Sequence, residues 1–460
     1  MPKLLINVNK SPKPIQYFCS NLVSGFTLVE TLVALGVLGI FFASVAIILQ
    51  LVLQNVAESR IRSVALSLAQ EKMENVRNLP YNQVGTQGGI PQGALLQSEI
   101  KNINSLDFTV KTSIIYIDDP FDGVAPNDLL NTDYKRVRIE IDWQGAYPSR
   151  YPVALVANVA PKGIETLAGG GTLYIQVFNS SGIPVSNATV AVDNTSINPN
   201  IHIQTLTNAN GILSLPGTPP CIACYQVTIT KPNYTTDKTY LSSEVANPLQ
   251  PSATVLEGKI TQISFAIDQA SQITVNSLGS RESEFPPISN VQFTLKGSKI
   301  IGYDTFDEPV YKYSFSTNTG GGTVSIPDLE WDSYKLDFSN SAYNLAGSNP
   351  LNPVVLLPAT KLTVAISAVP KSNTSLLVAV KKTGGELIAS ASARLTKLPE
   401  FDSTKPVGAS GAADFGQAFF GELIPGTYDL NIFSDGYQTA TASYSLTTIH
   451  QETITLNPNP

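Results

Sequence analysis

Few side chains in this sequence could carry out catalysis or hold a transition metal. The only histidines are His202 and His450, and of the three cysteines Cys19 lies far from the pair Cys221 and Cys224. A zinc site needs about four nitrogen or sulfur ligands, and the chain offers no convincing pair to join the two neighbouring cysteines. We therefore expect no catalytic site, no metal and no cofactor.

Cys221 and Cys224 form a C-x-x-C motif in an outer region that holds no other cysteine. Outside the cytoplasm such a pair favours a local disulfide, and we predict one here. A redox-active motif is the weaker alternative, because no helix start is evident that would lower the pKa of a thiol.

Residues 118–133 gather oxygen donors of the kind that calcium prefers. The donors are Asp118, Asp119, Asp122, Asn127, Asp128 and Asp133. Their spacing fits no defined calcium loop, and the prolines and Gly123 of this stretch are typical of a solvated turn. We interpret the stretch as a turn and assign no metal to it.

Two further groups invite a functional interpretation. Asp304, Asp307 and Glu308 raise the alternative of a hydrolase, but no convincing base and nucleophile accompany them. Trp331 is the aromatic residue most open to a ligand-binding role. Packing in a core is the preferred interpretation of this ring, as it is for the tyrosines described below.

Glu30 is the one charged residue in an apolar stretch from Phe26 to Leu53. The stretch exceeds the roughly 20 residues that cross a bilayer as a helix. A lone carboxylate within a membrane costs roughly 2.5 to 3.5 kcal/mol on insertion scales. Glu30 therefore requires a cationic partner.

The charges around the apolar stretch predict its orientation. Lys3, Lys10 and Lys13 precede it, and residues 1–25 contain no acid. Positive charge keeps this end in the cytoplasm and places the chain after about residue 55 outside. An ordinary secretory signal peptide, cut near Ser44 and Ala46, is an alternative that leaves the position of Glu30 unexplained.

The junction Ser24-Gly25-Phe26-Thr27-Leu28-Val29-Glu30 closely resembles the type IV prepilin family, in which a leader ending in Gly is followed by Phe and then by Glu. The resemblance implies that prepilin peptidase cuts between Gly25 and Phe26 and that the new Phe26 amine is N-methylated. It also implies that Glu30 pairs with a Phe26 amine, its own or that of an adjacent subunit. Opposite charges attract strongly in a low-dielectric medium, which agrees with an assembly role for Glu30.

One departure narrows the resemblance. Many pilus-forming members carry a proline midway along the anchor, whereas this chain reads Ala46-Ile47-Ile48. The similarity therefore favours the minor pilins and the type II secretion pseudopilins.

The elements that position these residues follow from periodicity. Residues 1–25 are the predicted leader, and residues 26–79 are the predicted helix, with 26–54 transmembrane. Beyond residue 55, apolar side chains continue at spacings of three and four up to Pro80, as in an amphipathic helix.

Residues 80–160 are expected to form a small antiparallel sheet that packs on the helix as a pilin head. Strands are expected near residues 108–117, 134–143 and 151–158. One face of the second strand is apolar, with Val137, Ile139, Ile141 and Trp143.

Residues 161–171 predict a linker, and three β-sandwiches follow over 172–269, 270–370 and 371–460. The repeat is marked by pairs of tyrosines nine residues apart: Tyr225 with Tyr234, Tyr334 with Tyr343, and Tyr428 with Tyr437. Upstream apolar pairs predict a matching earlier strand in each repeat, namely Val190 with Val192, Phe293 with Leu295, and Ala393 with Leu395.

Two phrases of the repeats, Asn208-Ala209-Asn210-Gly211 and Leu423-Ile424-Pro425-Gly426-Thr427-Tyr428, resemble the carboxypeptidase regulatory-like family of β-sandwiches. The middle repeat departs from this pattern over residues 329–334. The resemblance implies a structural or binding role without an active site.

Together these observations predict an α+β fold in which a long N-terminal helix and a small antiparallel sheet precede about three Ig-like sandwiches. The formal net charge is −7, and it becomes −10 without the three lysines of residues 1–25, which argues against nucleic acid as a partner. The expected function is a non-enzymatic minor pilin or pseudopilin of a type IV pilus or type II secretion filament.

This prediction implies a place in the cell and a set of partners. We expect a single pass through the bacterial inner membrane with the C-terminus outside, followed by incorporation into an extracellular filament or display at the cell surface. The implied partners are other pilin subunits, prepilin peptidase and the membrane. A membrane-anchored adhesin, whose sandwiches bind a surface carbohydrate or protein, is the alternative.

Overall fold

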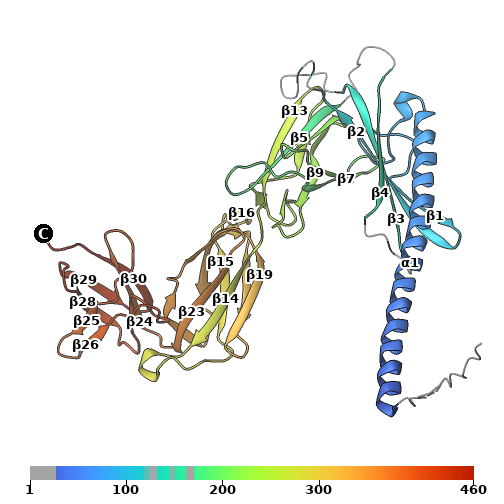
Figure 1. Ribbon diagram of the computed structural model, residues 1–460. Coiled ribbons are helices and arrows are strands. Elements are labelled where there is room, and N and C mark those ends of the chain that lie inside the picture. Colours follow the sequence, from blue (N-terminus) through green and yellow to red (C-terminus); the bar gives the residue numbers. More distant parts are fainter. Residues whose placement is uncertain are drawn as a thin grey trace, which may run out of the picture.

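A fifty-residue helix, α1 (Leu28–Arg77), runs along one side of the molecule (Figure 1). The computed structural model describes residues 27–119, 121, 123, 132–145, 148, 151–161 and 170–460. Thr27 caps the helix by accepting a hydrogen bond from the backbone N–H of Glu30. The described residues cover only the second half of α1, whose buried side chains are Ala65, Leu68, Ala69, Met73 and Val76.

A four-stranded antiparallel sheet, which we call the head sheet, packs on this second half. Its order is β1 (Ser98–Ile103), β2 (Leu106–Ile117), β3 (Tyr134–Trp143) and β4 (Val153–Val159). The inward residues of β3 are the predicted apolar set, and they share one core with the buried face of α1. A short 3-10 turn, η1 (Tyr81–Gln83), connects the helix to the loop that precedes β1.

Residues 170–460 form three units of two facing sheets, which we call the first, second and third sandwich. In the first sandwich one sheet contains β5 (Gly171–Phe178), β8 (Ile212–Thr218) and β13 (Ile260–Ala266). The other contains β6 (Thr189–Asn194), β7 (Ile201–Leu206), β9 (Cys221–Thr230), β10 (Asp237–Lys238) and β12 (Ala253–Val255). A single apolar core lies between them.

The second sandwich has two four-stranded sheets around its own core. One contains β14 (Ser271–Leu278), β19 (Thr323–Leu329), β21 (Tyr343–Asn349) and β23 (Lys361–Pro370), and the turn η2 (Arg281–Ser283) follows β14. The other contains β15 (Gln292–Gly297), β18 (Ser314–Asn318), β20 (Asp332–Asp337) and β22 (Val354–Leu356). A hairpin of β16 (Ile300–Tyr303) and β17 (Pro309–Tyr311) extends from it and pairs with β11 (Asn247–Pro248).

The third sandwich has one sheet of β24 (Ser375–Lys382), β27 (Gln417–Phe420) and β30 (Ile449–Leu456). Its second sheet contains β25 (Ser392–Lys397), β26 (Phe401–Pro406), β28 (Gly426–Phe433) and β29 (Ala440–Leu446). The predicted α+β fold, with a long helix followed by β-sandwich repeats, is confirmed.

The three sandwiches share a topology that explains the sequence repeat. In each, the strand that begins near the first tyrosine of a pair lies beside the predicted earlier strand. The opposed residues are Val192 and Val227, Leu295 and Leu336, and Leu395 and Leu430. The first and last strands of each sandwich are parallel neighbours, namely β5 with β13, β14 with β23, and β24 with β30.

Candidate functional site

The first half of α1 is an apolar surface that no described segment of the chain covers. Large side chains are exposed along it from Leu28, which is 77% exposed, to Val56, which is 45% exposed. By length and composition the helix can cross a membrane. An uncovered surface of this kind needs a bilayer or other helices around it.

Glu30 lies in the first turn of α1, at the start of this surface. Its carboxylate shares a shallow hollow with the apolar side chains Val33, Ala34, Val37, Leu38 and Phe41. A carboxylate in the first turn interacts favourably with the helix dipole, but none of the described residues that line the hollow is a cation. The predicted cleavage and methylation residues, Gly25 and Phe26, lie outside the described residues.

Cys221 and Cys224 are joined by a disulfide at the beginning of β9. Strand β9 already pairs with β12 at Cys221, and the pairing shifts register before Tyr225. Ala223 adopts a φ of 53° within this irregular stretch, and its N–H donates to Thr254 Oγ1 at 2.8 Å. The disulfide therefore closes a bulge in a strand.

The first tyrosine of each predicted pair is a core residue. Tyr225 is fully buried, and Tyr334 and Tyr428 are 1% exposed. Each hydroxyl donates one hydrogen bond to a backbone carbonyl upstream. The acceptors are Pro219 at 2.6 Å, Glu330 at 2.9 Å and Ile424 at 2.8 Å. These rings serve packing and turn geometry, which leaves their hydroxyls unavailable to a ligand.

The acids of the hydrolase alternative lie on the β16–β17 hairpin. The side chain of Asp304 accepts hydrogen bonds from the N–H groups of Phe306, at 2.7 Å, and Glu308, at 3.0 Å. Asp307 is exposed in the same turn. Asp304 thus shapes a hairpin turn, in the way that aspartates commonly do.

The acidic stretch 118–133 is described only in part, because Asp122 and Asp128 lie outside the described residues. Asp133 accepts a hydrogen bond from the N–H of Asp119. Among the described residues there is no group of three or more His, Cys, Asp or Glu side chains arranged to hold a metal.

Trp331 has one ring face occupied. The ammonium of Lys299 lies 3.6 Å from the ring centroid, and the same ammonium pairs with Glu330 at 2.5 Å. This cation–π contact is a structural role for the ring.

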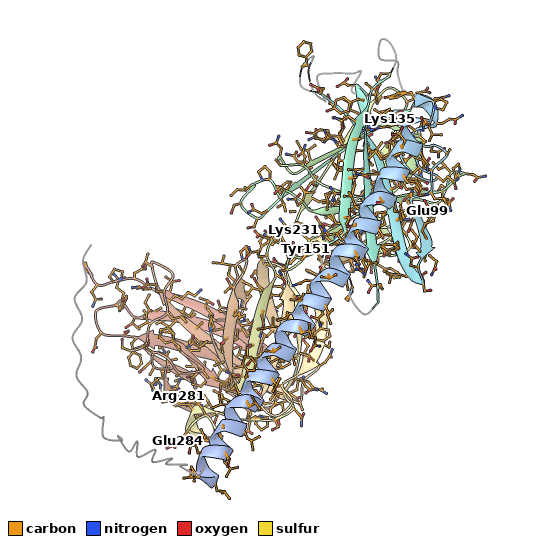
Figure 2. The ribbon with its side chains drawn as sticks, turned by 45° about the vertical axis from the view of Figure 1, so that its right-hand side comes forward. Glu99, Lys135, Tyr151, Lys231, Arg281 and Glu284 are labelled. Atoms are coloured by element: carbon orange, nitrogen blue, oxygen red, sulfur yellow. A yellow bond between two sulfur atoms is a disulfide. The ribbon has the colours of Figure 1, made fainter. Side chains whose placement is uncertain are left out.

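Lys135 is a buried cation that sequence analysis missed. It is 2% exposed, and its Nζ donates to the carbonyl oxygens of Tyr81 at 2.8 Å and Val84 at 2.7 Å. The ammonium also lies 4.4 Å from the centroid of the Tyr81 ring. Burial lowers the pKa of Lys135 to about 8. Figure 2 shows it near the upper end of α1.

A signal for Lys135 was present in the sequence. The residue lies two positions before Val137 and therefore on the apolar face of β3. A lysine on such a face is buried when backbone carbonyls are near enough to receive it. Alternation thus predicts its burial, while its partners come from a loop that alternation does not position.

Comparison with known proteins adds little. No family model matches the chain, and no curated protein matches it. Solved structures with some likeness include the Bacillus anthracis TIE protein, at 13% identity and a TM-score of 0.19, covering 79% of this chain and 76% of that one. The shaft pilin SpaA from Lactobacillus rhamnosus GG has 13% identity and a TM-score of 0.16, covering 42% of this chain and 99% of that one.

A streptococcal ancillary pilin has 12% identity and a TM-score of 0.18, covering 63% of this chain and 99% of that one. At such identities and TM-scores these likenesses carry no argument about the function of this chain.

Proposed function

We propose that this chain is a non-enzymatic minor pilin or pseudopilin of a type IV pilus or type II secretion filament, in which α1 assembles and the sandwiches are displayed. The observation that carries the proposal is the division of α1. Its first half is apolar and uncovered by any described residue, with a single carboxylate at its start, whereas one face of its second half is buried against the head sheet.

This division gives each half a separate task. The uncovered half suits the membrane before assembly and packing against neighbouring helices after it. Glu30 then has a reason to lie in an apolar surface, because the amine created by cleavage before Phe26 is a cation at the same depth. The proposal adds prepilin peptidase and other pilin subunits as partners.

Mass spectrometry of the protein purified from cell envelopes tests the processing step. We expect a mature chain that begins with N-methylated Phe26. A chain that retains residues 1–25, or one cut near Ala46, would contradict the proposal.

The role of Glu30 has its own test. Glu30→Ala should leave membrane insertion intact and strongly reduce recovery of the protein in sheared filaments, because the Phe26 amine loses its partner. Glu71→Ala is the matched control, since Glu71 is an exposed acid on the covered half of the same helix. Equal recovery of the Glu30 variant and the wild type would remove the assembly role.

A further inference from the structure

The head and the first sandwich are interlocked by a loop. Residues 84–95 leave the head, and Ile90 from this loop is 1% exposed because it is buried in the core of the first sandwich. The carbonyl of Gly88 accepts a hydrogen bond from the N–H of His202 at 2.8 Å. A Cβ at Gly88 would lie 2.6 Å from the carbonyl oxygen of Asn200, so the two backbones are in direct contact.

The first and second sandwiches share a small sheet. Strand β11 of the first pairs with β16 of the second, and the N–H of Leu249 donates to the carbonyl of Ile301 at 2.9 Å. Gly302 lies at the closest approach, where a Cβ would lie 2.5 Å from Cγ1 of Val245. Figure 1 shows β16 at the point where the two sandwiches meet.

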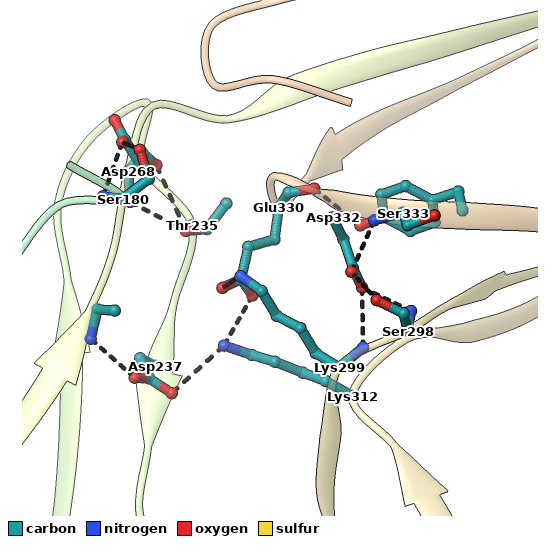
Figure 3. Close-up of polar contacts among 12 residues, drawn as sticks. Ser180, Thr235, Asp237, Asp268, Ser298, Lys299, Lys312, Glu330, Asp332 and Ser333 are labelled. Carbon is teal, nitrogen blue, oxygen red and sulfur yellow. Dashed lines mark hydrogen bonds and ion pairs between the residues drawn. The ribbon is translucent and has the colours of Figure 1, made fainter. Parts of the chain in front are cut away.

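Ion pairs at the same joint connect the first sandwich to the second (Figure 3). Lys312 of the second sandwich lies 3.3 Å from Asp237 of the first and 2.7 Å from Glu330. The three side chains are 19%, 14% and 12% exposed, so the ammonium is largely removed from water. Burial alone would lower the pKa of Lys312, but the two carboxylates outweigh it and raise the pKa. Lys312 therefore stays protonated at neutral pH.

The second and third sandwiches pack side against side. Gln417 is fully buried and exchanges two hydrogen bonds with the backbone of Ser348, at 2.7 and 3.2 Å. Arg281 donates to the carboxylate of Asp414 and to the carbonyl of Gln417. A Cβ at Gly347 would lie 2.6 Å from the Cα of Asp414. Leu377 and Phe419 of the third sandwich pack with the core of the second.

From these three joints we infer that the head and the sandwiches form one rigid arm, which fixes the orientation of the third sandwich relative to α1. Sandwiches tied by a flexible linker would meet through few, exposed contacts. Here each joint combines a buried side chain or a shared sheet with a backbone approach that admits only glycine. The inference concerns the chain itself and holds whether or not the chain assembles into a filament.

Distances between paired spin labels on the full-length protein in detergent test the inference. For labelling, one exposed residue in each part of the chain is replaced by cysteine. These residues are Lys101 in the head, Asn210 in the first sandwich, Gln292 in the second and Asp435 in the third. Cys19 is replaced by Ser, and the disulfide stays oxidised. A control pair within the first sandwich, Gln204 and Glu257, gives the width expected of a rigid body.

The pairs that span the three joints are Lys101–Asn210, Asn210–Gln292 and Gln292–Asp435. We expect each of them to give one distance distribution as narrow as that of the control pair. A broad distribution for any spanning pair would overturn the inference. Gly302→Val should widen the Asn210–Gln292 distribution and leave the Gln292–Asp435 distribution unchanged.

Gly321→Val is the matched control, because nothing lies within 4 Å of a Cβ at that position. If Gly302→Val does not fold, Lys312→Gln removes the ammonium that joins Asp237 to Glu330 and should widen the same distribution. A distribution that neither Gly302→Val nor Lys312→Gln widens would show that these contacts do not set the joint.

Discussion

The ammonium of Lys135 lies 2.7 Å from the carbonyl oxygen of Val84, inside the head and at the base of the loop that carries Ile90. This hydrogen bond holds the loop on β3 while Ile90 enters the first sandwich. The charge that makes the bond strong also carries a desolvation cost, since burial lowers the pKa of Lys135 to about 8 from the usual 10.5.

The first prediction concerns the pH dependence of the head. Between pH 8 and 10.5 the unfolded chain binds more protons at Lys135 than the folded chain does, so the free energy of unfolding should rise with pH across this window. Lys135→Met should abolish that rise. Tyrosines with pKa values raised by burial oppose it at the upper end, and the difference between wild type and variant removes their contribution.

Fluorescence of Trp143 measures unfolding of the head. Trp143 is 1% exposed in the head core, and Trp331 is the other of two tryptophans, so a Trp331→Phe background isolates the signal. Lys111→Met is the control, because Lys111 is exposed on the neighbouring strand. An unchanged pH slope in the Lys135 variant would contradict the prediction.

The second prediction concerns the buried tyrosine hydroxyls. Tyr428→Phe should lower the free energy of unfolding of the third sandwich by about 1 kcal/mol, because the carbonyl of Ile424 loses its hydrogen bond inside the protein. Tyr437→Phe should change it little, since the Tyr437 hydroxyl makes no hydrogen bond within the described residues. Hydrogen–deuterium exchange of residues 371–460 measures both, and equal effects of the two variants would refute the assignment.

The third prediction concerns the disulfide. In the chain-entropy model, a disulfide that closes a loop as short as that between Cys221 and Cys224 stabilises the folded state by about 2 kcal/mol. The double change to serine should therefore lower the stability of the first sandwich alone. Exchange rates in residues 172–269 should increase while those in residues 371–460 stay the same. An increase in both regions would show that the disulfide affects more than its bulge.

The fourth prediction concerns Gln417. Gln417→Ala leaves the N–H and carbonyl of Ser348 unpaired in a buried site, which should cost about 1 to 3 kcal/mol. Because Ser348 belongs to the second sandwich and Gln417 to the third, proteolysis should accelerate in both sandwiches. Gln451→Ala, at an exposed position of β30, is the control. Faster cleavage confined to the third sandwich would mean that the two sandwiches unfold independently.

Periodicity predicted the elements well, because it reports which side of a strand faces a core. The alternation of β3 and the tyrosine spacing placed Val137 and Tyr428 correctly in their cores. The same alternation places Lys135 on the inward face of β3, because it lies two positions before Val137.

The joints between units could not be predicted in this way. Lys312 and Asp237 are far apart in the sequence, and nothing near either residue indicates the other. Ile90 lies in a glycine-rich loop. A loop has no helical or strand periodicity, so the burial of an apolar residue in it cannot be predicted from the spacing of its neighbours. Such contacts depend on how whole sandwiches dock, which local patterns do not encode.

The parallel pairing of the first and last strands in each sandwich has a consequence for mechanical load. These ladders hold seven register pairs in the first sandwich, seven in the second and eight in the third. When the two ends of a sandwich are pulled apart, parallel strands slide past each other, so the force acts across all their hydrogen bonds together. Antiparallel terminal strands would instead peel apart bond by bond. Tension between the anchored helix and the far end of the arm is thus met in shear by every sandwich along its path.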